Sequence, residues 1–128
     1  MYYWNNVVEF KSLEGKIFTD IKVQEGDYDK EDEIVFVCDN GENFSMQHQQ
    51  DCCESVRIEE IIGSLDNLLN SEILLAEEVT NNENQLDEWD ESFTWTFYKL
   101  STIKGDVTIR WYGTSNGYYS EDVDLIWL

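Results

Sequence analysis

The 128-residue sequence contains no proline, one histidine and only eight lysine and arginine residues. Without proline, its turns have to be formed by glycine, asparagine and aspartate. Its apolar runs are only a few residues long, whereas a transmembrane helix needs about 20 apolar residues. The N-terminal residues lack the basic and apolar regions of a signal peptide. We therefore expect a soluble cytoplasmic protein that does not interact with membranes.

Acidic side chains dominate the composition. The chain has 28 aspartate and glutamate residues, a formal net charge of -20 and a pI near 4.1. Such a charge repels nucleic acid and attracts basic protein surfaces. Acidic disordered chains are poor in aromatic residues, but 14% of this sequence is aromatic and 41% is hydrophobic. We therefore expect one folded acidic domain over residues 1–128.

Alternation of apolar and polar residues predicts a β-rich fold. Asp39-Asn40-Gly41 is typical of a hairpin turn, whereas the apolar spacing over 59–70 favours a short or broken helix, with Ser64 as a cap. The predicted class is α+β: a twisted antiparallel sheet of about six to eight strands with one short or broken helix. The expected strands are 16–23, 33–38, 43–48, 55–58, 73–79, 93–98, 107–112 and 122–128.

The hairpin near the C-terminus has the clearest alternation. It predicts an inward face of large side chains, with polar residues on the opposite face. The inward set is Phe93, Trp95, Phe97, Val107, Ile109 and Trp111.

Two acidic runs are candidates for binding. The first resembles the opening of a calcium loop, but Asp32 and Cys38 stand where that loop needs glycine and a bidentate glutamate. The remaining interpretations are a solvated loop, a patch that binds a basic protein, or a cation site of another kind. The runs comprise Asp27, Tyr28, Asp29, Glu31 and Asp32, and then Glu83, Asp87, Glu88, Trp89 and Asp90.

The segment around the single histidine is a second candidate. It holds His48, Cys52 and Cys53, residue types that can bind zinc or form a thiol nucleophile with its base. Adjacent cysteines in an extended chain point to opposite sides, so we favour free thiols, one in a turn and one buried. Cys38 makes the cysteine count odd, which also favours a reducing compartment. We expect no metal and no cofactor.

The polar segment 111–120 is a third candidate. Ser115, Asn116, Tyr118 and Tyr119 are residue types that are common in binding loops. The segment is either a strand connection with an Asn-Gly turn or a recognition loop for a protein or small ligand. No lysine follows its glycines, so a phosphate cradle is not expected.

Several short motifs carry a resemblance to a known family. They are 49–56 (QQDCCESV), 58–63 (IEEIIG), 94–98 (TWTFY) and 110–120 (RWYGTSNGYYS). These motifs resemble a family of small proteins from phages, prophages and bacteria, over roughly residues 12–126. That family has no assigned biochemical activity and no established functional residues.

The resemblance implies a setting in phage counter-defence, since small acidic phage proteins often inhibit defence enzymes, as many anti-CRISPR proteins do. The leading hypothesis is a non-enzymatic inhibitor that mimics nucleic acid and binds a basic, nucleic-acid-binding host protein in the host cytoplasm. The alternatives are a protein that binds a nucleotide signal through the 111–120 loop, and a metal- or thiol-dependent protein at His48, Cys52 and Cys53. Homodimer formation stays open.

Overall fold

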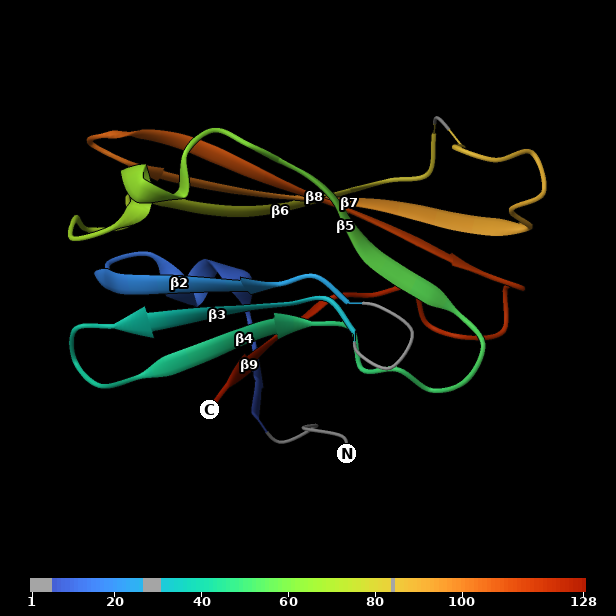
Figure 1. Cartoon of the computed structure of the whole chain (residues 1–128), viewed down its shortest axis with the longest axis horizontal. Helices are drawn as coiled ribbons and strands as arrows, with labels where there is room; N and C mark the ends of the chain where they lie inside the picture. The colour runs from blue at the N-terminus through green and yellow to red at the C-terminus, as the bar shows by residue number, and fades with distance from the viewer. Residues whose placement is uncertain (1–5, 27–30, 84) are drawn as a thin grey trace.

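Two antiparallel sheets face each other in the protein (Figure 1). The structure is a computed structural model and describes residues 6–26, 31–83 and 85–128. One sheet has five strands in the order β1-β9-β4-β3-β2, and the other has four in the order β5-β8-β7-β6. The expected antiparallel, β-rich fold with little helix is confirmed, and its strands are divided between these two sheets.

The elements follow the alternating segments of the sequence. The five-stranded sheet contains β1 (Val7–Val8), β2 (Phe18–Gln24), β3 (Glu33–Cys38), β4 (Asn43–Gln47) and β9 (Asp124–Trp127). The four-stranded sheet contains β5 (Ser55–Ile62), β6 (Leu75–Asn81), β7 (Ser92–Thr102) and β8 (Gly105–Ser115). The helical elements of the described residues are two 3₁₀ turns, η2 (Phe10–Leu13) and η3 (Leu65–Leu68).

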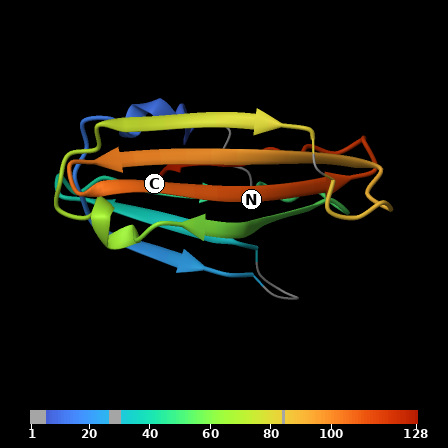
Figure 2. The same ribbon diagram turned by 90° about the horizontal axis from the view of Figure 1, so that it is seen from above.

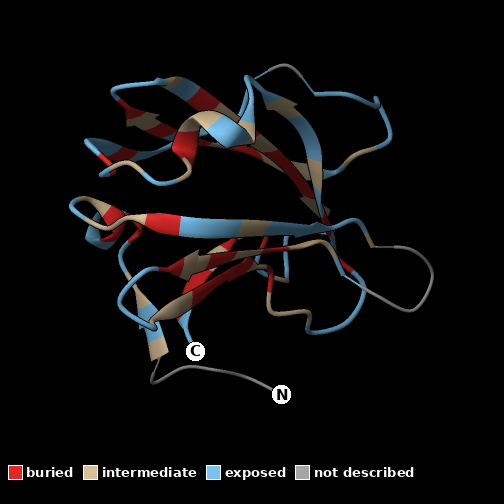
Figure 3. Cartoon of the chain, turned by 60° about the vertical axis from the view of Figure 1, so that its left-hand side comes forward, coloured by how far each residue is buried: buried red, intermediate tan, exposed pale blue. Residues whose placement is uncertain are grey.

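The core fills the space between the sheets, where most buried residues lie (Figure 3). Phe36 and Met46 come from the five-stranded sheet, and Ile109 and Trp111 from the other. The Trp111 indole N–H donates to the Met46 sulfur at 3.2 Å and so joins the two layers. Burial of these large side chains is the main stabilising contribution of such a sandwich.

The predicted helix over 59–70 is only partly correct. Residues 59–62 continue β5, and the helical part shrinks to η3. The pairing of β5 with β8 shifts its register between Ile58 and Glu60, so the extra residue of a β-bulge separates inward-facing Ile58 from inward-facing Ile61. The end of β5 was predicted as helix because Ile61 and Ile62 precede Leu65 of η3 by four and three residues, which is helical spacing. Ser64 does occupy the N-cap position of η3, but its side chain makes no capping hydrogen bond.

The predicted inward face of the β7–β8 hairpin is correct for β8 and wrong for β7. Ile109 and Trp111 belong to the core, and their partners across the ladder are Tyr98 and Thr96. Trp95 instead pairs with Tyr112 and therefore lies on the outer face of the sheet, together with Phe93 and Phe97 on the same strand. Both faces of β7 carry large residues, so alternation alone does not distinguish them.

Candidate functional site

Loops from distant parts of the sequence meet at one end of the sandwich, on the right of Figure 1 and also on the right when seen from above in Figure 2. Loop 48–54 leads into Ser55 of β5, which pairs with Thr114 near the end of β8. The next residue, Ser115, pairs with Ser92, where loop 82–91 enters β7. The strand register therefore places these loops beside one another.

The five-stranded sheet brings its own loops to the same end. The segment 116–123 connects β8 to Asp124, which pairs with Gln47 just before loop 48–54. Glu33 also pairs with Gln47 and closes the β2–β3 hairpin around 25–32. We call this surface the acidic end and define it as the described residues of 25–32, 48–54, 82–91 and 116–123.

The acidic end concentrates the charge of the protein. The described residues of its four segments include 12 of the 28 acidic residues of the sequence and no lysine or arginine. Many of the carboxylates are exposed, so water solvates them and they produce a negative field at this surface. The exposed members are Glu25, Glu31, Asp51, Glu83, Asp87, Glu88, Glu91 and Asp122.

Loop 82–91 is held against the outer face of the four-stranded sheet. The Tyr112 hydroxyl donates to the Asp90 carboxylate at 2.6 Å and accepts the Leu86 backbone N–H at 3.1 Å. Burial and the Asp90 carboxylate raise the pKa of Tyr112, so the hydroxyl keeps its proton. The Trp89 side chain stays 82% exposed and Leu86 50% exposed. Two apolar side chains are thus presented among the predicted carboxylates Glu83, Asp87 and Glu88.

Both arginines of the chain lie on the outer sheet face near this loop. The Arg110 guanidinium lies 4.7 Å from the centre of the Trp95 ring, and that of Arg57 lies 5.8 Å from the Tyr112 ring. Arg110 also forms an ion pair with Glu60, and Arg57 forms one with Glu59. These cation–π and ion-pair contacts support the platform on which loop 82–91 rests.

The first acidic run is divided by the structure. Asp27, Tyr28 and Asp29 lie outside the described residues, and Glu31 is exposed. Asp32 is not a free surface charge, because its carboxylate accepts the backbone N–H groups of Gly26 and Ile58. Asp32 therefore ties this hairpin to β5, a role that the sequence did not predict, and its contact with a partner stays a prediction.

The 113–120 loop is built by its own side chains. Ser115 accepts the Gly117 N–H at 3.0 Å, and Asn116 accepts the Tyr118 N–H at 2.9 Å. Tyr118 is 83% exposed and packs edge-to-face with Tyr119, with ring centres 5.0 Å apart. Ser115 and Asn116 thus shape the turn, and Tyr118 is the side chain that the turn displays.

Glu121 lies beneath that turn and is buried. Its carboxylate accepts the hydroxyl groups of Ser115 at 2.5 Å and Thr94 at 2.8 Å. It thereby joins the 116–123 segment to the ends of β7 and β8.

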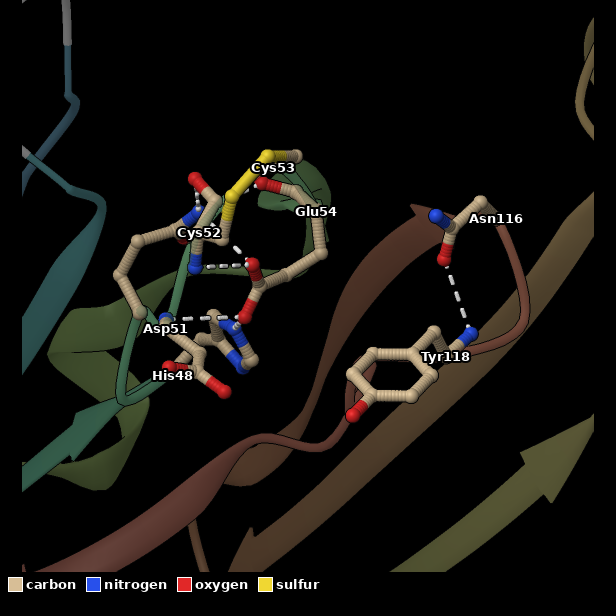
Figure 4. Close-up of a disulfide and its surroundings, with 8 residues drawn as sticks. His48, Asp51, Cys52, Cys53, Glu54, Asn116 and Tyr118 are labelled. Atoms are coloured by element: carbon tan, nitrogen blue, oxygen red, sulfur yellow. Dashed lines mark hydrogen bonds and ion pairs between the residues drawn. A yellow bond between two sulfur atoms is a disulfide. The ribbon is translucent and has the colours of Figure 1, made fainter.

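Loop 48–54 contains a buried histidine–glutamate pair (Figure 4). His48 Nε2 lies 2.9 Å from Glu54 Oε2, and His48 Nδ1 lies 2.6 Å from the Asp122 carbonyl oxygen. The Glu54 carboxylate also accepts the backbone N–H groups of Asp51 and Cys52. Burial raises the pKa of Glu54, but the hydrogen bonds from Cys52, His48 and Asp51 outweigh it and hold that pKa at about 2. The loop therefore encloses a carboxylate that is ionised in the folded protein.

The prediction of free thiols is wrong for two of the three cysteines. Cys52 and Cys53 are both exposed and form a disulfide between neighbouring residues (Figure 4), while Cys38 is free and buried. Both nitrogens of His48 face oxygen atoms, so His48 is not positioned as the base for a cysteine thiol. Across residues 6–26, 31–83 and 85–128, no cluster of three or more His, Cys, Asp or Glu side chains is arranged to hold a metal ion.

Two grooves lie outside the predicted small-ligand loop. The larger, of about 780 Å³, is lined by residues of β1, β6 and the segment 122–125, with Tyr98 among them. The smaller, of about 340 Å³, lies between 25–32 and the start of β5. Residues 111–120 line neither groove. In the part of the chain that is described, no helix has the length and apolarity needed to cross a membrane.

Comparison with known proteins identifies the family. A family model described as a domain of unknown function (DUF7448) matches residues 11–125. The chain belongs to the DUF7448 family. No curated protein matches it, and no solved structure does. The matched span of this DUF7448 domain includes all the loops of the acidic end.

Several residues organise the acidic end in roles that were not predicted. Glu54, Glu121 and Asp32 bind backbone N–H or hydroxyl groups inside the protein, and Tyr112 anchors loop 82–91. The sequence gives little sign of these roles, because the residues beside a carboxylate in the sequence do not show whether it is buried or solvated. The available signal is that Glu54 and Tyr112 fall within the short motifs on which the family resemblance rests.

Proposed function

We propose that this DUF7448 domain is a non-enzymatic interaction protein whose acidic end binds a basic surface of another protein. One observation carries the proposal: the strand register gathers the described residues of four separate loops, with 12 of the 28 acidic residues and no lysine or arginine, onto one end of the fold. A field of one sign over a single surface steers a partner of opposite charge and speeds its association.

The exposed aromatic residues at this end supply the short-range part of binding. Trp89 and Tyr118 are more than four-fifths exposed, and each sits on a loop stabilised by hydrogen bonds. Tryptophan and tyrosine are enriched among the residues that dominate binding energy at interfaces. Pre-ordered loops lower the entropy cost of association. The surface thus combines long-range attraction with apolar anchors.

We propose further that the partner is a nucleic-acid-binding protein and that the carboxylates replace its phosphate ligands. Support for this step comes from the net charge of -20 and from the resemblance to small phage proteins. The proposed setting is inhibition of a host defence enzyme in the host cytoplasm.

A competition experiment tests the mimicry. Fluorescent duplex DNA is bound to an oligo-arginine peptide, and the domain is titrated at low and moderate salt. We expect the domain to release the DNA, less effectively as salt screens the charges. DNA that stays bound at a large excess of the domain at low salt would refute the mimicry.

A further inference from the structure

The Cys52–Cys53 disulfide joins adjacent residues on the surface of the acidic end. A disulfide that supports a fold does so mainly by closing a long loop in the unfolded chain, and its effect grows with the length of that loop. This bond closes no loop beyond its own two residues, so it constrains the unfolded chain very little. We therefore look for the role of this disulfide in its thiol–disulfide chemistry and not in the stability of the fold.

The loop around the disulfide is held by contacts that do not involve sulfur (Figure 4). The Glu54 carboxylate accepts the Asp51 N–H at 3.0 Å and the Cys52 N–H at 2.9 Å. The Gln50 side chain donates to the Glu54 backbone carbonyl at 2.7 Å and to the Cys52 carbonyl at 3.2 Å. Breaking the sulfur–sulfur bond leaves all these contacts available. The two thiols then stay close together, and such proximity gives a high effective concentration for closing the bond again.

Thiols in solution can reach the sulfur atoms of the pair, whereas the third cysteine of the chain cannot. Both cysteines of the pair are exposed. The third cysteine, Cys38, is 4% exposed, and burial raises its pKa, so it remains a protonated core thiol. Exchange with this disulfide therefore requires a thiol from outside the protein.

We propose that Cys52–Cys53 is a reversible thiol–disulfide exchange site whose substrate is an external dithiol reductant. A thiolate of the dithiol attacks one sulfur of the pair and forms a mixed disulfide, and the other cysteine leaves as a thiolate and takes up a proton. The second thiolate of the reductant then attacks its own sulfur in the mixed disulfide and releases the remaining cysteine. Two electrons pass to the protein, and the dithiol becomes a disulfide. In reducing compartments, disulfides of this transient kind serve catalysis or sensing.

The surrounding charge selects among reductants. Asp51, Glu54 and Asp122 belong to the loops around the pair, and no lysine or arginine occurs in 48–54 or 116–123. A thiolate that carries further negative charge, such as glutathione, is repelled by this field, whereas a small dithiol such as dithiothreitol is repelled less. At equal thiolate concentration and low salt, we expect glutathione to react about tenfold more slowly. Added salt should reduce the difference between the two reaction rates, because it screens the repulsion.

The test uses the purified full chain and maleimide labelling read by peptide mass mapping. After treatment with oxidised glutathione, neither Cys52 nor Cys53 should take label. A sample reduced with dithiothreitol and then desalted should take label at both cysteines, and a sample that is re-oxidised before maleimide is added should take label at neither. The melting temperature should change by less than about 2 °C between the two forms, while the amide signals of Asp51 and Cys52 move and that of Met46 does not.

Two variants serve as controls. Cys53→Ser removes the resolving thiol, so Cys52 should retain a mixed disulfide with glutathione, whereas the wild-type pair should expel it. Cys38→Ser should leave the labelling of the pair unchanged. The proposal is overturned if both cysteines take label after oxidation, if wild type retains glutathione as Cys53→Ser does, or if reduction lowers the melting temperature by more than about 5 °C.

Discussion

Gly113 and Glu121 are in direct contact beneath the exposed tyrosine loop. A Cβ atom at Gly113 would lie 2.9 Å from the Glu121 backbone oxygen and 3.0 Å from the Glu121 Cβ. Only glycine at position 113 lets β8 approach the backbone of Glu121 this closely. The approach places the Glu121 carboxylate between Thr94 and Ser115, so one contact fixes how three segments meet at the acidic end.

Replacement of Gly113 by alanine should therefore destabilise the protein. The added methyl group meets backbone atoms that cannot rotate away, and such overpacking costs about 2 to 3 kcal/mol. Urea unfolding measures the loss. Gly117→Ala is the matched control, because nothing lies within 4 Å of its Cβ position and only its φ of +89° is unfavourable, which costs about 1 kcal/mol. Equal losses for the two variants would show that the contact with Glu121 is not tight.

Tyr112→Phe should release loop 82–91 from the sheet. It removes the hydroxyl that binds both Asp90 and the Leu86 N–H, a loss of about 1 to 2 kcal/mol. Hydrogen exchange at the Leu86 amide should accelerate about tenfold, because each 1.4 kcal/mol of local opening energy corresponds to a factor of ten. Tyr118→Phe removes an exposed hydroxyl from the neighbouring loop and should leave that amide unchanged. If the Leu86 amide keeps its protection in Tyr112→Phe, another group anchors the loop.

Glu54 should make stability depend on pH at the acidic extreme. Its pKa is about 2 in the folded protein against a reference value of 4.5. A lowered folded pKa stabilises the protein above the unfolded value, so this contribution is complete above about pH 4.5 and is lost as pH falls towards 2. Its size is on the order of 3 kcal/mol. The unfolding free energies of wild type and Glu54→Gln, measured by urea unfolding, should differ most near neutral pH and converge below pH 4.5. A difference that stays constant across this range would contradict the ionised, hydrogen-bonded state of Glu54.

Salt should raise the melting temperature of the protein. Carboxylates crowded at one end repel one another, and added salt screens that repulsion. Calorimetry from low to moderate ionic strength measures the rise. Glu83→Gln/Asp87→Asn/Glu88→Gln removes three negative charges from the acidic end, and Asp39→Asn/Asp66→Asn/Asp106→Asn removes three from elsewhere. The rise in melting temperature with salt should be smaller in the first variant than in the second. A melting temperature that is flat or falls with salt in wild type would show that the clustered carboxylates do not repel.

Much of the fold follows from local sequence pattern. The alternation that predicted strands at 33–38 and 107–112 reflects one buried face for each strand, as in β3 and β8. The division into two sheets depends instead on the pairing of β4 with β9, whose residues lie far apart in the sequence. The end of β5 was predicted as helix because Ile61 and Ile62 stand at helical spacing from Leu65, and the sequence does not show that a strand ends and a 3₁₀ turn begins between them.

The acidic end was predictable in composition but not in arrangement. Loop 82–91 is acidic in sequence and exposed in the structure, as expected. Asp32 stands between two glutamates and Glu54 follows two cysteines, yet both carboxylates accept backbone N–H groups inside the protein. Which carboxylate turns inward depends on where those N–H groups lie, and that is set by long-range strand register.

The most direct test of the proposed function compares association rates for two charge-matched variants. Glu83→Gln/Asp87→Asn/Glu88→Gln neutralises exposed carboxylates of the acidic end and keeps Asp90, which Tyr112 binds. Asp39→Asn/Asp66→Asn/Asp106→Asn neutralises exposed carboxylates outside it. The measurement is the association rate constant for an immobilised oligo-arginine peptide at low salt. We predict that the first variant associates about tenfold more slowly than wild type, while the second stays within about twofold, and that moderate salt removes the difference. Equal slowing by both variants would show that only total charge matters and would contradict a binding role for the acidic end.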